Sequence, residues 1–253
     1  MSSLTTALIV FACLFISMML GFFLRGVAPQ HHLETDSKDT VKLATGLIAT
    51  LSALVLGLLV ASARDSFNQV SGELMRMAVR VVLLDRVLAQ YGPDAKEIRV
   101  LMKTGYSTAS DLMLSGEEAQ QMQLDTPEAL ARWENIQAKL RELSPQSDAQ
   151  RGLKSRALEI SDELTGSRWL LIVQSKGSVS MPLLVVLVFW LSMIFTAWSV
   201  YAPRNTIVTA ALLACAMCVS GAIFLILEMD SPMTGLIRVS GTAVRAALSH
   251  LGE

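Results

Sequence analysis

Apolar residues fill four long stretches of the chain that contain no charged side chain. They cover residues 4–24, 43–63, 179–202 and 205–227, and charged residues stand at their borders. Each is about as long as the roughly 20 apolar residues that an α-helix needs to cross a bilayer. The pattern therefore predicts an integral membrane protein with four transmembrane helices.

The first stretch is expected to remain in the protein as a helix. A cleaved signal peptide has a basic start, a short apolar core and a small-residue cleavage site. No Lys or Arg precedes residues 4–24, the apolar core is long, and no A-x-A site follows it. A retained transmembrane helix fits these features better than a signal peptide.

Most charged residues lie between the second and third apolar stretches, in residues 64–176. Apolar residues recur there three and four positions apart, as in amphipathic helices. Gly92-Pro93 and Thr126-Pro127 are typical of a turn or cap at which a helix starts. We therefore expect an all-α fold with a helical extramembrane insert. The expected domains are 1–63 (transmembrane helices one and two), 64–178 (insert), 179–229 (helices three and four) and 230–253 (a short amphipathic tail).

The second apolar stretch contains small residues and hydroxyl groups rather than aromatic ones. A stripe of small side chains recurs three and four residues apart, which lets another helix approach closely. The expected helix-packing residues are Gly46, Ala53, Gly57 and Ala61. The candidates for a pore lining are Thr45, Thr50 and Ser52. Packing and pore lining are both open, and an oligomer assembled around an axis would combine them.

The helical pattern continues beyond the second stretch as a heptad seam. Its apolar positions are Phe67, Val70, Leu74, Met77, Val81, Leu84 and Leu88. We expect one long helix over residues 41–90 that leaves the bilayer as a stalk. The seam is typical of a coiled coil between subunits, and equally of bundle packing inside one subunit.

Composition narrows the function classes. The hydrophobic fraction is 52% and the net charge is −1, so we expect no nucleic-acid partner. No H-E-x-x-H, G-x-S-x-G or P-loop motif is present, and we expect neither an enzyme, a cofactor nor a bound metal. The three cysteines, Cys13, Cys215 and Cys218, lie inside apolar stretches and are expected to be unpaired packing residues.

Two segments resemble the bacterial bestrophin-like family. One runs over residues 57–65 (GLLVASARD) and continues into 83–93 (LLDRVLAQYGP). The other is 227–240 (LEMDSPMTGLIRVS), where Met233 replaces the Phe that is usual in the family. The resemblance marks a membrane-exit motif at both places. Its residues are Arg64, Asp65, Asp230, Pro232, Gly235 and Ser240.

This resemblance implies a homo-oligomeric membrane channel for small inorganic ions. Calcium gating is not expected, because Ca²⁺ needs about six or more oxygen ligands and only Glu228 and Asp230 are acidic in the second segment. The alternative is a membrane sensor or scaffold that does not conduct, whose helical insert transmits signals or binds a partner. Arg64 and Asp230 are expected on the same membrane surface, where they could pair.

The charges near the spans favour one topology. Basic residues are slightly more frequent on the side of the insert, so the positive-inside rule places the insert in the cytoplasm. With the resemblance to a bacterial family, the expected location is the bacterial inner membrane.

Overall fold

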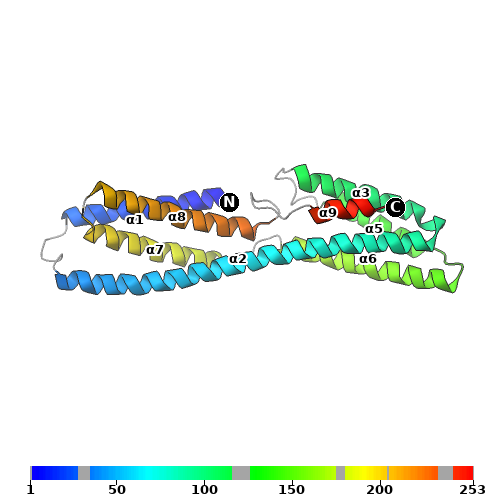
Figure 1. Ribbon diagram of the computed structural model, residues 1–253, viewed down its shortest axis with the longest axis horizontal. Coiled ribbons are helices and arrows are strands. Elements are labelled where there is room, and N and C mark those ends of the chain that lie inside the picture. The colour runs from blue at the N-terminus through cyan, green and yellow to red at the C-terminus, as the bar shows by residue number, and fades with distance from the viewer. Residues whose placement is uncertain are drawn as a thin grey trace. The chain divides into compact units, whose positions relative to one another are not determined.

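The computed structural model describes residues 2–27, 35–115, 126–174, 180–203, 205–232 and 242–252. The fold within these ranges is all-α, without a β-strand (Figure 1). The helices are α1 Ser3–Val27, α2 Thr35–Tyr91, η2 Pro93–Ala95, α3 Lys96–Ser115, α5 Pro127–Glu142, α6 Asp148–Gln174, α7 Met181–Tyr201, α8 Thr206–Asp230 and α9 Thr242–His250.

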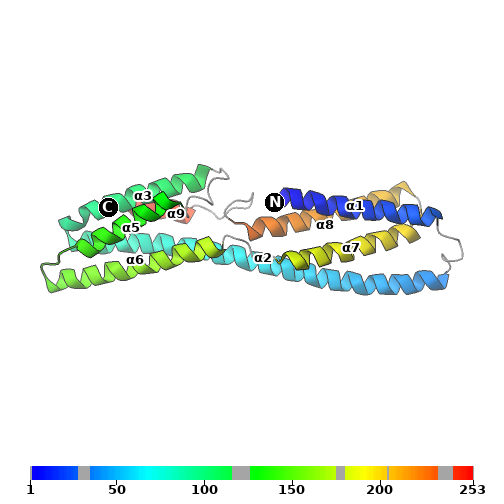
Figure 2. The ribbon, with the colours of Figure 1, turned by 180° about the vertical axis from the view of Figure 1, so that it is seen from behind.

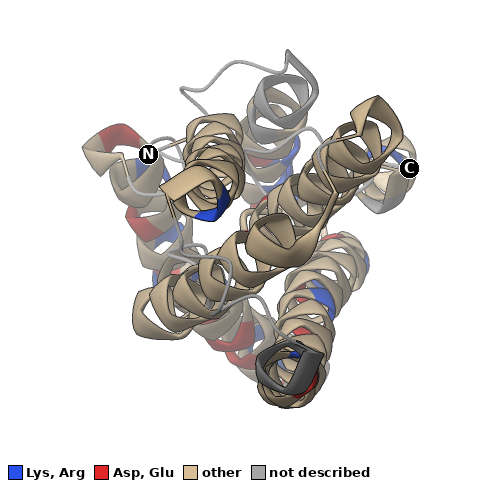
Figure 3. Cartoon of the chain, turned by 90° about the vertical axis from the view of Figure 1, so that its left-hand side faces the viewer, with Lys and Arg blue, Asp and Glu red and all other residues tan. Residues whose placement is uncertain are grey.

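Four of these helices are long and apolar enough to cross a membrane, namely α1, α2, α7 and α8. They coincide with the four predicted spans. Helix α2 has 57 residues and is unbroken from its apolar part into the insert, so the predicted long stalk is confirmed. In Figure 3 charged residues are sparse on the ribbons nearest the viewer, which belong to these spans.

The chain divides into two compact units. The membrane unit contains Met1–Asp65 and Ser178–Asp230, and the insert unit contains Ser66–Gly177 and Ser231–Glu253. Helix α2 contributes its first part to the membrane unit and its second part to the insert unit.

Helix α1 is the centre of the membrane unit, where it packs along both α7 and α8 (Figure 2). Val10, Leu14 and Met18 of α1 lie in one apolar cluster with Phe195 of α7 and Ile223 of α8. An interhelical hydrogen bond adds to this contact, since Thr196 Oγ1 donates to the Ser17 carbonyl at 3.2 Å. Polar contacts of this kind hold helices together in lipid, where apolar burial alone gives little preference for helix association.

The insert unit is a helical bundle around its own apolar core. Leu84 and Leu88 of α2, Ile98 of α3, Leu140 of α5 and Ile160 of α6 belong to this core, and none is more than 6% exposed. The heptad seam of α2 faces the same bundle. Its buried positions contact helices of the same chain, which decides between the two interpretations of the seam in favour of packing inside one subunit.

Two helix starts in the insert follow from local chemistry. Gly92 has φ +117°, a conformation that glycine adopts easily, and Pro93 begins the next helical turn. At α5, Thr126 Oγ1 accepts a hydrogen bond from the Ala129 amide at 3.2 Å, and Pro127 occupies the first helical position. Both starts agree with the prediction from the sequence.

Candidate functional site

One side of α2 packs against the membrane unit and the other side stays uncovered. Leu59 and Ala63 are almost fully buried and lie in a cluster with Leu187 of α7 and Ile226 of α8. Only 17% of the residues in the apolar window of α2 are buried, compared with 33% in that of α8. Helix α2 is therefore the span whose surface is least covered by its own chain.

The predicted small-residue stripe lies on the uncovered side. Its members are Gly46, Thr50, Ala53, Gly57 and Ala61, and all five are exposed. A Cβ atom placed on Gly46 or Gly57 would meet no atom within 4 Å. All five stripe residues are thus exposed among the residues that the structure describes, and the stripe is open to a neighbouring molecule.

The three hydroxyl residues expected to line a pore do not share one face. Thr45 and Ser52, 6% and 3% exposed, lie on the packed side of α2, whereas Thr50 is on the uncovered side. The reason is helix geometry, because residues seven apart fall on the same side of a helix, while Thr50 is turned away from both. Thr50 Oγ1 donates to the Gly46 carbonyl at 2.9 Å.

The two buried hydroxyls differ in how their hydrogen bonds are satisfied. Thr45 Oγ1 donates to the Val41 carbonyl at 2.6 Å. Ser52 Oγ has no hydrogen-bond partner among the residues that the structure describes. Of the three candidates, Thr50 is therefore the one whose side chain is exposed on the surface of the chain.

A row of leucines lies next to the small-residue stripe. Leu43, Leu47, Leu54 and Leu58 are between 61% and 77% exposed. At 100° per residue they follow the stripe along one of its edges. The uncovered surface of α2 therefore has a small, partly hydroxylated edge and a bulky apolar edge.

The residues of the membrane-exit motif lie in different environments. Arg64 and Asp65 are exposed, whereas Glu228 and Asp230 are each only 6% exposed. In the described part of the chain no ion pair joins Arg64 to Asp230, so the expected pairing is not made here. Pro232 is buried in a turn after α8. Gly235 and Ser240 lie outside the described residues.

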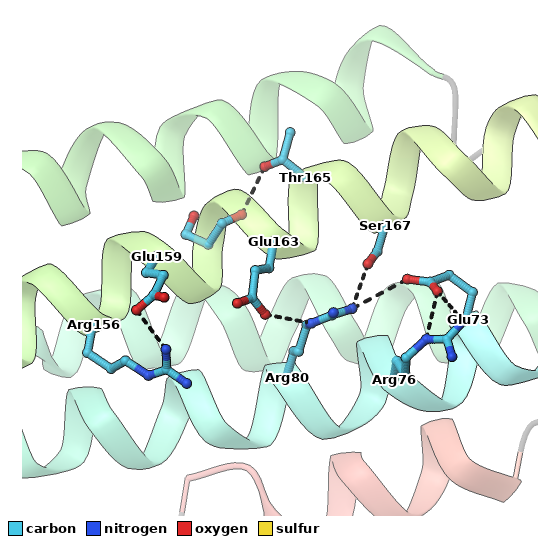
Figure 4. A network of polar contacts seen from close by, with 9 residues as sticks. Glu73, Arg76, Arg80, Arg156, Glu159, Glu163, Thr165 and Ser167 are labelled. Carbon is cyan, nitrogen blue, oxygen red and sulfur yellow. Dashed lines mark hydrogen bonds and ion pairs between the residues drawn. The ribbon is translucent and has the colours of Figure 1, made fainter.

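An ionic network connects α2 to α6 in the insert (Figure 4). Arg80 of α2 donates from Nε to Glu163 at 2.8 Å and from Nη1 to Ser167 Oγ at 2.8 Å, both on α6. Arg80 also reaches Glu73 at 3.4 Å, and Arg76 contacts the second oxygen of Glu73 at 2.6 Å. One guanidinium group therefore joins two helices.

Glu73 is the buried member of this network, with a side chain that is 7% exposed. Burial by itself raises its pKa, but the hydrogen bond with Ser167 and the positive charges of Arg76 and Arg80 outweigh it. The pKa of Glu73 is therefore lowered from its ordinary value. Sequence reasoning missed this network. Its only local signal is the spacing of Glu73, Arg76 and Arg80 along one helix face.

A second buried carboxylate lies in the segment that resembles the bestrophin-like family. Asp85 of α2 is 1% exposed and accepts two hydrogen bonds from Arg99 of α3, at 2.7 and 2.8 Å. It accepts a third from the Gly252 amide at 3.2 Å. Burial by itself raises the pKa of Asp85. The hydrogen bonds from Arg99 and Gly252 have a larger, opposite effect, so the pKa of Asp85 is lowered from its ordinary value. Sequence reasoning missed this pairing too.

Metal ligands are not gathered anywhere in the described ranges. No group of three or more His, Cys, Asp or Glu side chains among those residues is placed to hold a metal ion. Cys215 and Cys218 are both exposed on α8. The features left for a function are therefore the uncovered face of α2 and the ion pairs of the insert.

Solved structures of similar fold include two bacterial bestrophin homologues from Klebsiella pneumoniae. One carries an isoleucine-to-threonine mutation and is 14% identical, with a TM-score of 0.64 over 99% of each chain. The other carries a leucine-to-threonine mutation and is 13% identical, with a TM-score of 0.64 over 96% of this chain and 99% of that one. A third structure, of a membrane protein with a proline-to-alanine mutation, is 13% identical with a TM-score of 0.58 over 96% of this chain and 99% of that one.

The similarity to these structures extends over nearly the whole length of the chain and establishes the fold. A comparison with curated protein sequences found no match. The family model described as the bestrophin-like domain matches residues 7–244, which include all four spans and the insert. The chain belongs to the bestrophin-like family.

Proposed function

We propose that this protein is a homo-oligomeric membrane channel that passes small ions without calcium gating. The observation that carries the proposal is the uncovered stripe of α2, in which Thr50 lies among small residues on the face that the chain leaves open. Membership of the bestrophin-like family supports the same class of function.

The stripe is suited to an assembly of several chains. Small side chains allow a neighbouring backbone to come close, and they leave room for a pathway if several α2 helices surround an axis. The part of α2 that carries the stripe, residues 43–63, contains no charged residue. Ion-coupled transporters usually need an ionisable group inside the membrane, so a passive pore is favoured over a pump.

The absence of calcium gating is proposed from the number of available ligands. Glu228 and Asp230 are the only acidic residues in segment 227–240, whereas Ca²⁺ requires about six or more oxygen atoms. Two carboxylate side chains supply too few oxygen atoms for a calcium site of this kind. The bacterial inner membrane is proposed from the similarity to bacterial homologues, and the Lys and Arg residues near the spans favour an insert, residues 64–178, in the cytoplasm.

Recordings of the ion current through the purified protein test this proposal. The protein should have a mass of several subunits and should conduct in planar bilayers, with or without a calcium chelator. Thr50→Phe should reduce the current, because it places a large ring on the uncovered face. Met217→Phe is the matched control, since Met217 is 65% exposed on α8. Assembled protein that passes no current under varied voltage, pH and ion composition would refute the channel.

A sensor or scaffold is the second candidate function. It is favoured by the continuity of α2, which crosses from the membrane unit into the insert without a break. Arg80 then ties that helix to α6. A displacement of α2 could reach the insert through these contacts. If assembled protein does not conduct, this function becomes the leading one.

A further inference from the structure

Residues 242–252, which contain α9 and the turn after it, pack on the insert unit. We call this segment the strap. Val244, Ala247 and Leu251 are 6%, 5% and 1% exposed, and Leu251 belongs to the core of the insert. Helix α9 lies against α3. The strap therefore completes an apolar core built by α2, α3, α5 and α6, all of which precede the spans α7 and α8 in the chain.

Asp85 is the polar attachment point of the strap. Its Oδ2 atom accepts both from Arg99 Nη2 at 2.8 Å and from the Gly252 amide at 3.2 Å. Gly252 has φ +86°, the left-handed region that favours glycine, and this conformation accompanies the turn whose amide reaches the carboxylate. Helix α2, helix α3 and the strap thus converge on one buried carboxylate.

The strap can leave without exposing an unpaired charge. Arg99 keeps both of its hydrogen bonds to Asp85 when the Gly252 amide is withdrawn, so the buried carboxylate stays compensated. A helix of nine residues such as α9 is also marginally stable on its own. Its order depends on Leu251 and its neighbours remaining docked. Such a segment opens at a lower free energy than the whole bundle unfolds.

We propose that residues 242–252 form a releasable strap that ties the chain leaving α8 to Asp85 of the insert. Residues 231–241 join the strap to α8, which is a membrane span. The strap is therefore a third covalent route between spans and insert, besides α2 and the α6–α7 connection. Unlike α2, it holds through contacts that can be broken and remade.

Limited trypsin digestion of the full-length purified protein tests the strap. Arg245 is exposed on α9, but trypsin needs an unfolded segment, so cleavage after Arg245 reports release of the strap. Leu251→Ala should accelerate this cleavage at least about tenfold, because it removes the buried anchor. The melting temperature of the rest of the protein should change little. Ser249→Ala is the matched control, since Ser249 is exposed and its hydroxyl contacts only the Ala246 carbonyl.

A second variant keeps the test decisive if Leu251→Ala folds poorly. Gly252→Ala leaves Leu251 and the Asp85–Arg99 pair in place but strains the left-handed turn, and its Cβ would lie 3.2 Å from Lys103 Nζ. It should also accelerate cleavage at Arg245, to a smaller extent. The proposal is overturned if both variants are cleaved at the wild-type rate. It is equally overturned if cleavage at Arg245 always accompanies unfolding of the entire insert.

Discussion

Gly21 of α1 lies directly against Ser199 of α7. A Cβ atom on Gly21 would be 2.5 Å from the Ser199 Cβ and 2.5 Å from the Thr196 carbonyl oxygen, both far closer than van der Waals contact. Ser199 itself is fully buried. The absence of a side chain at position 21 is therefore what allows these two spans to approach so closely.

Substitution of this glycine should separate the two helices. We expect Gly21→Ala to lower the free energy of unfolding by about 1–3 kcal/mol, since the added methyl group meets backbone that cannot rotate away. Thermal unfolding in detergent, followed by circular dichroism, measures the effect. Gly46→Ala is the control, because a Cβ there meets nothing within 4 Å. Equal stability of the two variants would show that the α1–α7 contact adjusts freely.

The uncovered stripe should matter for assembly rather than for the single chain. A Cβ atom on Gly57 would meet no atom within 4 Å, and Gly57→Leu places a large side chain where a neighbouring α2 would approach. We expect a lower native mass with an unchanged fold. Gly221→Leu on α8 is the control, since Gly221 is exposed and a Cβ atom there would also meet no atom within 4 Å. Native mass spectrometry separates these cases, and an unchanged mass in Gly57→Leu would exclude the stripe from the interface.

Acid should weaken the insert through Asp85. Its pKa is lowered in the folded state, so it stabilises the fold above the pKa of an unfolded Asp, about 3.9. This stabilisation is lost as the pH falls through the lowered pKa. Asp85→Asn should cost about 2–4 kcal/mol at neutral pH, because Arg99 loses its partner. The variant should also depend less on pH below 4.

In a background that keeps Trp133 as its single tryptophan, the fluorescence of Trp133 gives a local measurement of this loss, because its ring nitrogen donates to Thr165 within the insert. Unfolding curves of wild type and Asp85→Asn should converge as the pH is lowered. If the difference in stability between wild type and Asp85→Asn stays constant down to pH 2, protonation of Asp85 is not the cause of the acid sensitivity.

Arg80 should be the residue that holds α6 on α2. Arg80→Ala removes the bonds from Arg80 to Glu163 and Ser167 and leaves Glu73 with Arg76 as its remaining cationic partner. We expect a loss of about 1–3 kcal/mol in the stability of the insert. Arg156→Ala, which breaks an exposed pair with Glu159 on one helix, should leave the stability unchanged within error. Chemical denaturation of both variants gives the comparison.

Labelling of single cysteines should report the topology. In a background without Cys13, Cys215 and Cys218, a membrane-impermeant thiol reagent should label a cysteine introduced at His32 in whole cells. It should not reach one introduced at Ser147 in the insert. The reverse result would place the insert outside the cytoplasm.

The spans and the long helix α2 could be predicted because their causes are local. A stretch of about 20 residues without charge suits the hydrocarbon core wherever its neighbours lie. Small residues three and four apart likewise define a stripe from sequence alone. The caps at Gly92-Pro93 and Thr126-Pro127 depend on adjacent residues only.

Tertiary structure decided which side of each helix is used. Thr45, Thr50 and Ser52 are chemically similar, and only the position of the packed face separates the buried pair from the open Thr50. The heptad seam of α2 suited either a second chain or its own bundle until helices such as α6 occupied it. The bond between Asp85 and Gly252 joins residues 167 positions apart. No local pattern contains such a contact, because it exists only once the core has brought both ends together.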